Sequence, residues 1–394
     1  MHTHARKIVQ AFVHKHLNLI HAARRELYCA TVSAVVGGHL LSLSRLARAL
    51  MGQGTHKAAL KRVDRLIGNK RVAQEAKDVG AALLRTLSHA GQPLVIAVDW
   101  SAVAPDGAFV ELRASAMRAG MGRGLTIYQQ VYPEKKLGNA RAERTLLKTL
   151  SQWMPAGVRV IILTDAGFRR PWFTQVGRLG WSWIGRIRGS VCVSRDRTHW
   201  EQATAWFAKA TGKACRWSDC WLTSRFRFAC DMVLYRRRVK GGKRYGRAGH
   251  GSTPKARREA RASAYEPWLL SHSPCLRSYR AEQIVALYGL RMQIEENFRD
   301  GKSIPLGMGL EVSQSRSALR LHALLLIGTM AAFLLWHIGQ LAEAEGLHLR
   351  FKATTRVARE LSIITLAKIL CTLDSLPLTD AALQTLHERL GLRR

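Results

Sequence analysis

Apolar positions along the chain follow two different spacings, and the change between them predicts how the chain is organised. Across residues 1–90 they recur every three or four positions, which is typical of amphipathic helices. From Pro93 onward, short unbroken apolar runs replace that spacing. The run 94–98 (LVIAV) and the run 158–163 (VRVIIL) are typical of buried strands.

The elements around these two runs predict a mixed α/β layer. Glycines precede two further strand-like segments at 108–116 and 125–132, and another strand is expected at 183–187. Helical spacing is seen at 141–153 and 171–179. Three consecutive strands followed by strands that alternate with helices indicate an α/β fold with an antiparallel start.

The later part of the chain has a different composition. Tryptophans and short apolar segments between 190 and 270 predict a β-rich region, and residues 240–261, rich in Gly, Lys and Arg, predict a basic loop. Residues 281–300 are expected to form one helix, and 319–344 a long apolar one. Because the stretch 321–336 contains His322 and Thr329 and falls short of a bilayer span, we expect a buried core helix.

These patterns predict five regions. They are a helical region at 1–90, an α/β part at 91–189, a β-rich insertion with a basic loop at 190–270, a further part at 271–340, and a helical C-terminal region at 341–394.

The charge of the chain restricts its partners. Its 394 residues include 62 Lys or Arg against 27 Asp or Glu, a formal net charge of +35. Such an excess favours a polyanion, so DNA, RNA and the ribosome are all candidates. An anionic membrane is less favoured because the basic residues are spread along the whole chain.

One basic segment stands out within the helical N-terminal region. In residues 56–71 (HKAALKRVDRLIGNKR) one helical face is apolar and the rest is basic. Such a face can also be merely solvated, but in a chain this basic we expect DNA contact. The candidates are Lys57, Lys61, Arg62 and Arg65.

Cysteine usage and the first residues predict where the protein works. The seven cysteines contain no CxxC pair, and no fourth ligand follows Cys215, Cys220 and Cys230 at zinc-site spacing, so free thiols are expected. The first 16 residues are basic and lack the long apolar run of a signal peptide. We therefore expect a cytoplasmic, nucleoid-associated protein without a membrane anchor.

Carboxylates at the two apolar runs are the first candidates for chemistry. Asp99 ends the run in VIAVDW, and Asp165 closely follows the run in IILTDAG. Either residue could simply cap the next turn. Ligand sites of α/β sheets nevertheless lie at strand ends, so a shared site is the alternative.

A third acid lies in a more specific setting. In residues 288–302 (YGLRMQIEENFRDGK), a helix advancing roughly 100° per residue places Tyr288, Arg291, Glu295 and Lys302 on one stripe. Glu296 lies about a quarter turn away, which favours Glu295. Charge pairs on an ordinary amphipathic helix would give a similar pattern.

These residues together resemble a known family. The spacing Y-x2-R-x3-E-x6-K, met by Tyr288, Arg291, Glu295 and Lys302, is similar to the signature of the DDE transposases of the insertion-sequence-four family. The AVDW and TDAG segments resemble the strands that carry that family's first and second Asp. EPWLLSH, with Trp268, resembles its W-L-L-x-T strand, although His272 replaces Thr, and Ala166 replaces an Arg that often follows the second Asp.

The resemblance implies a ribonuclease-H-like catalytic domain. Its first part is 91–189 and its second part is 271–340, and the β-rich insertion at 190–270 interrupts it. The resemblance also implies that Asp99, Asp165 and Glu295 are catalytic. Three clustered carboxylates repel one another unless cations bind, and oxygen-only ligands favour Mg²⁺ or Mn²⁺, with two ions expected. Tyr288, Arg291 and Lys302 would contact DNA phosphates. Trp268 would stack on a base turned out of the duplex, although a core Trp on a strand is the alternative.

The predicted activity is DNA transposition. Hydrolysis would free a 3′-OH at each end of an insertion sequence, and that hydroxyl would then attack target DNA. The expected partner is double-stranded DNA, comprising terminal inverted repeats and target, bound by a homodimer. A nuclease of the same fold without strand transfer, and an inactive DNA-binding relative, are the alternatives; no RNA-recognition signature is present.

Overall fold

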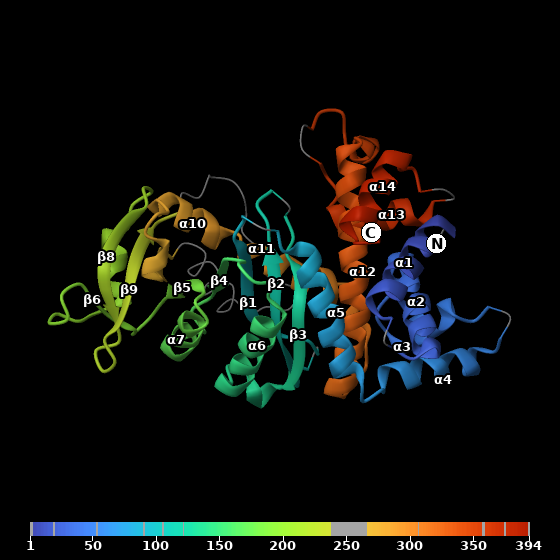
Figure 1. Ribbon diagram of the computed structural model, residues 1–394, viewed down its shortest axis with the longest axis horizontal. Coiled ribbons are helices and arrows are strands. Elements are labelled where there is room, and N and C mark those ends of the chain that lie inside the picture. Colours follow the sequence, from blue (N-terminus) through green and yellow to red (C-terminus); the bar gives the residue numbers. More distant parts are fainter. Residues whose placement is uncertain are drawn as a thin grey trace. The chain divides into compact units, whose positions relative to one another are not determined.

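The computed structural model describes residues 3–18, 20–52, 54–89, 91–104, 106–120, 122–237, 266–305, 307–356, 359–373 and 376–392 (Figure 1). It consists of two compact units. Unit 1 comprises Met1–Gln92, Val98–Val158 and Gln293–Arg394, and unit 2 comprises Pro93–Ala97 and Arg159–Met292.

Unit 1 begins with five helices, as the helical spacing of residues 1–90 predicts. Their capping is local: Ser42 and Thr55 accept hydrogen bonds from the backbone amides of Arg45 and Ala58 at the starts of the third and fourth helices. The helices are α1 (Thr3–His16), α2 (Ala22–Val36), α3 (Leu43–Ala49), α4 (His56–Ile67) and α5 (Val72–Leu87).

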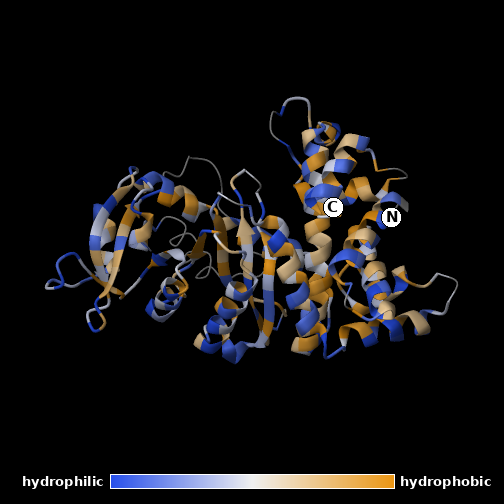
Figure 2. Cartoon of the chain, in the orientation of Figure 1, coloured by the Kyte–Doolittle hydropathy of each residue, from blue (hydrophilic) through white to orange (hydrophobic). Residues whose placement is uncertain are grey.

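The core of unit 1 is organised around α12 (Ala318–Ala344), the long apolar helix that the sequence predicts. By length and composition it could cross a membrane, but 72% of its most apolar window is buried inside the protein. It is coloured toward the hydrophobic end of the scale along much of its length in Figure 2. It packs against α2, α4, α5, α13 (Ile363–Thr372), α14 (Asp380–Arg389) and the strand β3 (Leu125–Pro133), which supports the prediction of a core helix.

Close approach to α12 depends on a glycine. A Cβ added at Gly339 would lie 2.3 Å from the carbonyl oxygen of Ile363, the first residue of α13. Any side chain there would push the two helices apart, so Gly339 fixes the spacing at which α13 covers the core.

The strands of unit 1 are β1 (Leu94–Ala102), β2 (Phe109–Met117) and β3, in the order β3-β2-β1. Strands β2 and β3 are antiparallel, with Leu112 opposite Gln130. Helix α6 (Ala140–Trp153) begins at Asn139, whose side chain accepts from two backbone amides, and α5 packs on β3. The connections include η1 (Glu134–Lys136), η4 (Leu310–Val312) and η5 (Leu347–Phe351), and α11 (Met292–Lys302) follows unit 2.

Unit 2 is a sheet in the order β1-β4-β5-β10-β9-β8-β6-β7, in which the first residues of β1 take part. Strands β4 and β5 are parallel, whereas β10 is antiparallel to both β5 and β9. The strands are β4 (Val160–Thr164), β5 (Ser182–Ile187), β6 (Cys192–Ser194), β7 (Glu201–Gln202), β8 (Cys215–Leu222), β9 (Phe228–Tyr235) and β10 (Trp268–His272); the helices are α7 (Arg170–Arg178), α8 (Ala203–Trp206), η2 (Phe207–Lys209), η3 (Pro274–Leu276) and α10 (Ala281–Gly289).

Two sequence predictions need correction. The strand that was expected to end at Asp99 continues to Ala102, so Asp99 lies inside β1. The single helix expected over 281–300 is two helices, α10 and α11, separated at Leu290 and Arg291. There the backbone amides bond three residues back, to Leu287 and Tyr288, and this tighter turn follows Gly289. The predicted basic loop at 240–261 lies outside the described residues.

Candidate active site

Asp99 lies half-buried where β1 passes from five fully buried residues to more accessible ones. One carboxylate oxygen accepts a hydrogen bond from the backbone amide of Trp100 at 2.9 Å. The indole of Trp100 donates in turn to Glu143 on α6, at 3.2 Å, and its ring lies 5.6 Å from that of Tyr132. These contacts of Trp100 fix β1 at the residue directly after the candidate acid Asp99.

A buried polar network attaches α11, which carries Glu295, to the sheet of unit 1. The side-chain oxygen of Asn297 accepts from Arg113 at 2.7 Å, from Thr126 at 2.8 Å and from Ser115 at 3.3 Å. Arg113 is itself held by Glu111 through three contacts of 2.9–3.2 Å. Because all of these groups are buried, they fix the helix at one register on β2 and β3.

Lys302 is turned toward β1 from the last residue of α11. Its ammonium group donates to the hydroxyl of Ser101, two residues after Asp99, at 2.6 Å. Burial lowers the pKa of Lys302, and the carboxylates of Glu111 and Asp99 oppose that shift. Unit 1 thus brings the half-buried Lys302 close to Asp99.

The two adjacent glutamates of α11 differ in their surroundings. Glu296 forms ion pairs with Arg123, at 3.5 Å, and with Arg299 one turn later on the helix. Arg123 also pairs with buried Asp300 at 2.6 Å. Glu296 therefore belongs to a structural ion-pair cluster, whereas Glu295 is exposed at the surface of α11.

Asp165 follows β4 directly in unit 2 and is half-buried. One of its oxygens accepts from the backbone amide of Gly167 at 2.9 Å, so the residue does shape the turn after the strand. The second oxygen takes no hydrogen bond from any group in the described part of the chain. Turn formation therefore uses only half of this carboxylate.

Basic and aromatic side chains lie around Asp165 in unit 2. Arg188 binds Glu266, which is the main cause of the raised pKa of Arg188; Asp165 adds to that shift. Burial lowers the pKa of Arg186, which is near Tyr288 and Arg291. A cationic surface beside a carboxylate is suited to an anionic substrate that bridges the two.

The sequence-predicted Tyr288 and Trp268 pack against each other. Tyr288, on α10, is only 3% exposed, and its ring meets that of Trp268 edge-on at 5.0 Å. Burial raises the pKa of Tyr288, and the guanidinium of Arg291 opposes the shift. Trp268 is half-buried and also contacts the ring of Tyr235 at 6.4 Å. The structure therefore brings Tyr288, Arg291 and Trp268 together, and Tyr288 contributes more to packing than its sequence role suggests.

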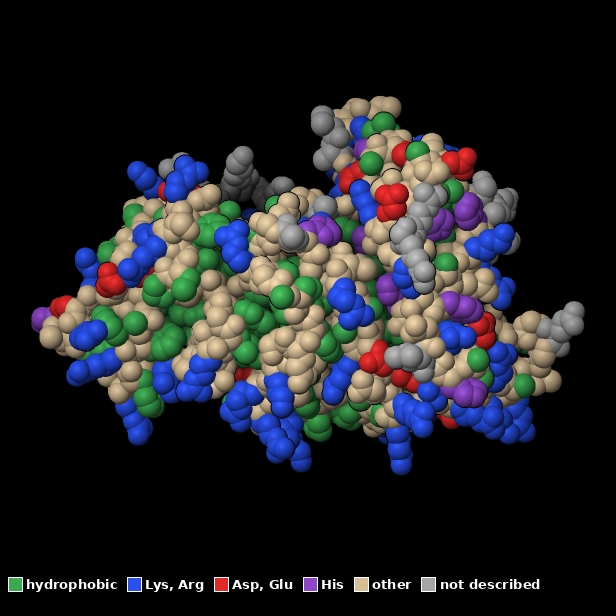
Figure 3. Space-filling model, viewed as in Figure 1, with side chains coloured by type: hydrophobic (Ala, Val, Ile, Leu, Met, Phe, Trp, Pro, Cys, Tyr) green, Lys and Arg blue, Asp and Glu red, His purple; other side chains and the backbone are tan. Residues whose placement is uncertain are grey.

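The basic residues predicted on α4 form a separate surface. The buried face of the helix is Ala59, Val63, Leu66 and Ile67, and Asp64 pairs with Arg320 of α12 at 2.6 Å. Lys and Arg side chains gather over α4 in Figure 3. All four predicted DNA-binding side chains are exposed: Lys57, Lys61, Arg62 and Arg65.

Several functional neighbours were missed from the sequence. Ser101, Glu111, Arg113 and Asn297 carry no motif, and Arg188 with Glu266 is a pair 78 residues apart. The available signal was Glu111 and Arg113 two positions apart on a predicted strand. That spacing places both on one face, but it does not reveal that the face is covered.

Fold and site together define an α/β protein with strand- and helix-borne carboxylates surrounded by basic groups. The sequence model of the transposase DDE domain family matches residues 121–334, more than half of the chain. The chain therefore belongs to the transposase DDE domain family. The match includes Asp165 and Glu295, whereas Asp99 precedes it.

Among solved structures, the chain is similar to a piggyBac transposase determined by electron cryomicroscopy as a synaptic complex with hairpin DNA. The TM-score is 0.41 at 10% sequence identity, over 92% of this chain and 75% of that chain. No curated protein matches the sequence.

The candidate acids fit the divalent ions that the family implies. Asp99, Asp165 and Glu295 offer only carboxylate oxygens, the ligands that Mg²⁺ and Mn²⁺ prefer. Within the described part of the chain, the second oxygen of Asp165 accepts no hydrogen bond, and the carboxylate of Glu295 is exposed on α11. Because no thiol or imidazole belongs to this set, zinc is disfavoured.

Proposed function

We propose that the protein is a DNA transposase with a ribonuclease-H-like core. In this proposal it binds the ends of an insertion sequence, cleaves them, and joins the 3′-OH ends to target DNA. Membership of the transposase DDE domain family supports the class of activity. The observation that carries the site is the reach of Lys302 to Ser101, because it sets the helix of Glu295 against the strand of Asp99 within unit 1.

Asp99, Asp165 and Glu295 are the proposed ligands of two Mg²⁺ or Mn²⁺ ions. Ions at this site would promote deprotonation of the attacking hydroxyl and stabilise the leaving oxygen. The inclusion of Asp165, in unit 2, rests on the family resemblance of its TDAG segment and on its unshared oxygen. The hydrogen bond from Trp100 to Asp99 and the Asn297 network would hold two of the acids in place before DNA arrives.

The basic side chains of the site have distinct proposed roles. Arg291, which like Asp165 lies near Tyr288, would bind a phosphate through its planar guanidinium, and Lys302 would balance negative charge next to Asp99. Trp268, whose ring is only half-buried, keeps surface on which a base could stack. Exposed residues of α4 would bind the phosphate backbone away from the chemistry.

The proposed partner is double-stranded DNA, and the proposed assembly is a homodimer on that DNA, because pairing two ends requires two active sites. A cytoplasmic, nucleoid-associated location accords with a net charge of +35.

The decisive experiment replaces each acid by its isosteric amide. Asp99→Asn, Asp165→Asn and Glu295→Gln should each reduce cleavage of end-containing DNA by at least about 100-fold, roughly 2.7 kcal/mol of transition-state stabilisation. DNA affinity should stay nearly constant, because most of it comes from phosphate contacts elsewhere. Glu296→Gln is the matched control, since it alters the neighbouring carboxylate of the same helix. Full cleavage by any of the three variants would remove that residue from the site.

The alternative of a nuclease is separated by supplying pre-cut ends with a free 3′-OH and a supercoiled target. A transposase must hold that end for a second displacement, so wild-type protein should give joined product with Mg²⁺ or Mn²⁺. Nicking of end-containing DNA without any joining of pre-cut ends would identify a nuclease instead.

A further inference from the structure

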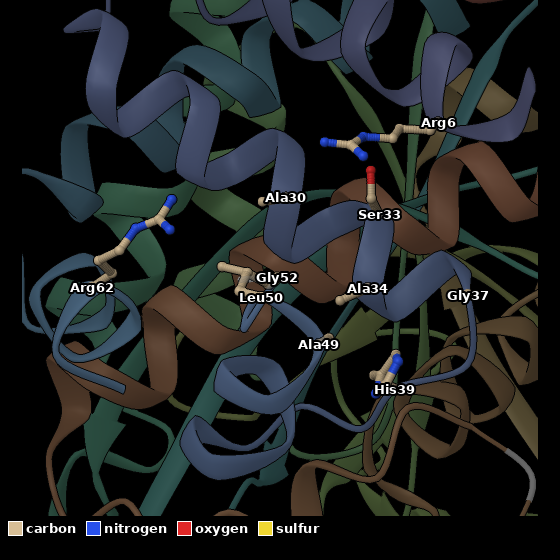
Figure 4. Close-up of a pocket in the computed structure, with 10 residues that line it drawn as sticks. All are labelled: Arg6, Ala30, Ser33, Ala34, Gly37, His39, Ala49, Leu50, Gly52 and Arg62. Atoms are coloured by element: carbon tan, nitrogen blue, oxygen red, sulfur yellow. The ribbon is translucent and has the colours of Figure 1, made fainter. Parts of the chain in front are cut away.

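A pocket of about 400 Å³ lies within unit 1, away from the candidate acids. It opens between α1, α2, the end of α3 and α4, as shown in Figure 4. Apart from Leu50, the residues that line it have small or basic side chains: Arg6, Ala30, Ser33, Ala34, Gly37, His39, Ala49, Leu50, Gly52 and Arg62.

The lining is positively charged without compensation. Arg6 and Arg62 contribute guanidinium groups from two different helices, His39 adds an imidazole, and the lining contains no Asp or Glu. Within the described residues, neither arginine forms an ion pair or a hydrogen bond. By contrast, Arg24 of α2 pairs with Glu75, and Arg320 of α12 pairs with Asp64. Two unpaired arginines facing one pocket are an anion-binding arrangement.

A buried hydroxyl at the pocket gives an independent indication. Ser33 is 8% exposed, and its hydroxyl has no hydrogen-bond partner among the described residues. On the same helix Thr31, two residues earlier, donates to the carbonyl of Leu27 at 2.8 Å. In Figure 4 the Ser33 oxygen points toward the guanidinium of Arg6. A buried polar group without a partner is unfavourable, so a ligand atom at this point would explain the residue.

We propose that this pocket binds a nucleotide phosphate, with Arg6, Ser33 and Arg62 as its ligands. The volume lies in the range of small-molecule sites, about 300–1,000 Å³, and exceeds what a phosphate alone would fill. The small side chains of Ala30, Ala34 and Ala49 leave room for the attached sugar. The phosphate can belong to a DNA strand or to a free nucleotide. This inference rests on one part of the proposed function, the DNA-binding role of α4.

The test measures binding of deoxyadenosine 5′-monophosphate and deoxyadenosine to the full chain by calorimetry. The wild-type protein should bind the monophosphate and not the nucleoside. Arg6→Gln and Ser33→Ala should weaken monophosphate binding by at least 10-fold and about 5-fold. Lys7→Gln is the control, because Lys7 is exposed, carries the same charge as its neighbour Arg6, and does not line the pocket. Its affinity should match the wild type.

A second measurement identifies the source of the phosphate. If a 20-base-pair duplex displaces the monophosphate and both variants bind the duplex more weakly, the ligand is a DNA phosphodiester. If duplex and monophosphate bind together, the ligand is a free nucleotide. Neither binding measurement requires DNA cleavage, so the result would stand even if the proposed catalytic function were wrong.

The proposal also predicts the stability of the Ser33→Ala variant. Its unfolding midpoint in urea should equal or exceed that of the wild type, because the hydroxyl has no hydrogen-bond partner among the described residues. A lower midpoint would mean that the hydroxyl bonds within the protein, and the proposal would then be wrong. Unchanged affinity of Arg6→Gln and Ser33→Ala for both probes would overturn it equally.

Discussion

Substitution of Glu111 by Gln should destabilise unit 1 far more than any surface charge substitution. Glu111 is fully buried on β2, and both of its oxygens accept from Arg113, which is 4% exposed. It also opposes the lowering of the pKa of Lys302 by burial. The carboxylate of Glu111 therefore stabilises the charges of both Arg113 and Lys302 at a position that is buried from water.

The magnitude follows from what the amide leaves behind. Gln keeps the shape of Glu but not its charge, and arginine stays protonated under all ordinary conditions. Breaking a buried ion pair by removing one partner costs about 3–5 kcal/mol. Lys302 can release its proton, which limits its share of the cost, so Arg113 should account for most of the loss.

The assay is urea unfolding of the full chain followed by tryptophan fluorescence and circular dichroism. Glu296→Gln is the control, because the Glu296 side chain is 35% exposed and its 3.5 Å contact with Arg123 is long, so its ion pairs should contribute less than about 1 kcal/mol. The pair Glu111→Leu with Arg113→Met removes both charges and should recover much of the stability. The reasoning would be refuted if Glu111→Gln lowered the free energy of unfolding by less than about 1 kcal/mol. It would also be refuted if the double variant were less stable than Glu111→Gln.

Two further predictions concern α12 and α4. Burial, followed by nearby Arg389 and Arg118, lowers the pKa of His337 from 6.5 to about 3, so the unfolded chain binds the proton first and stability should fall as the pH decreases from 6.5 toward 3, by up to about 1.4 kcal/mol per pH unit. Neither ring nitrogen of His337 has a hydrogen-bond partner among the described residues, so His337→Leu should raise the free energy of unfolding at pH 7 by about 1–3 kcal/mol and flatten the pH dependence. Urea unfolding at pH 7, 6 and 5 measures both effects, and an unchanged pH dependence would contradict the assignment. On α4, the combined variant Lys61→Gln, Arg62→Gln and Arg65→Gln should weaken duplex binding. The slope of log affinity against log salt concentration should fall by about 2–3, since each phosphate contact contributes about 0.9. An unaltered slope in a fluorescence anisotropy titration would exclude this surface.

Elements with a strong apolar period were predictable from the sequence. The run at 94–98 lies within β1, the run at 158–163 overlaps β4, which begins two residues later, and the helices at 141–153 and 319–344 are present within a residue of their predicted bounds. In these segments burial alone determines the conformation, so the pattern of apolar residues contains the needed information. The break at Leu290 was not predictable in this way, because helical spacing continues through it and only Gly289 marks the site.

The polar interior of unit 1 shows why the site could be predicted only in part. In strand β2, FVELRASAM, apolar and polar residues alternate, a pattern typical of a strand with one face in water. Yet Glu111, Arg113 and Ser115 are all buried, because α11 covers that face. Which helix covers a strand is a long-range property, and residues 111 and 297 lie far apart in sequence. The motif acids were found by resemblance, whereas the residues that position them required the structure.

The burial of Lys302 changes how the motif of α11 should be understood. Read from the sequence alone, Lys302 is one of several basic residues on a helix and a natural contact for DNA. In the structure its ammonium donates to Ser101 on β1, and Glu111 on β2 partly offsets its burial. The sheet therefore supplies both a hydrogen-bond acceptor and negative charge for this half-buried cation. Since Glu111 also holds Arg113, which binds Asn297 two residues after Glu295, one buried carboxylate links the positions of Asp99 and Glu295. Correct placement of these two acids and correct folding of unit 1 thus depend on the same charge, which explains why a residue outside any motif should affect both.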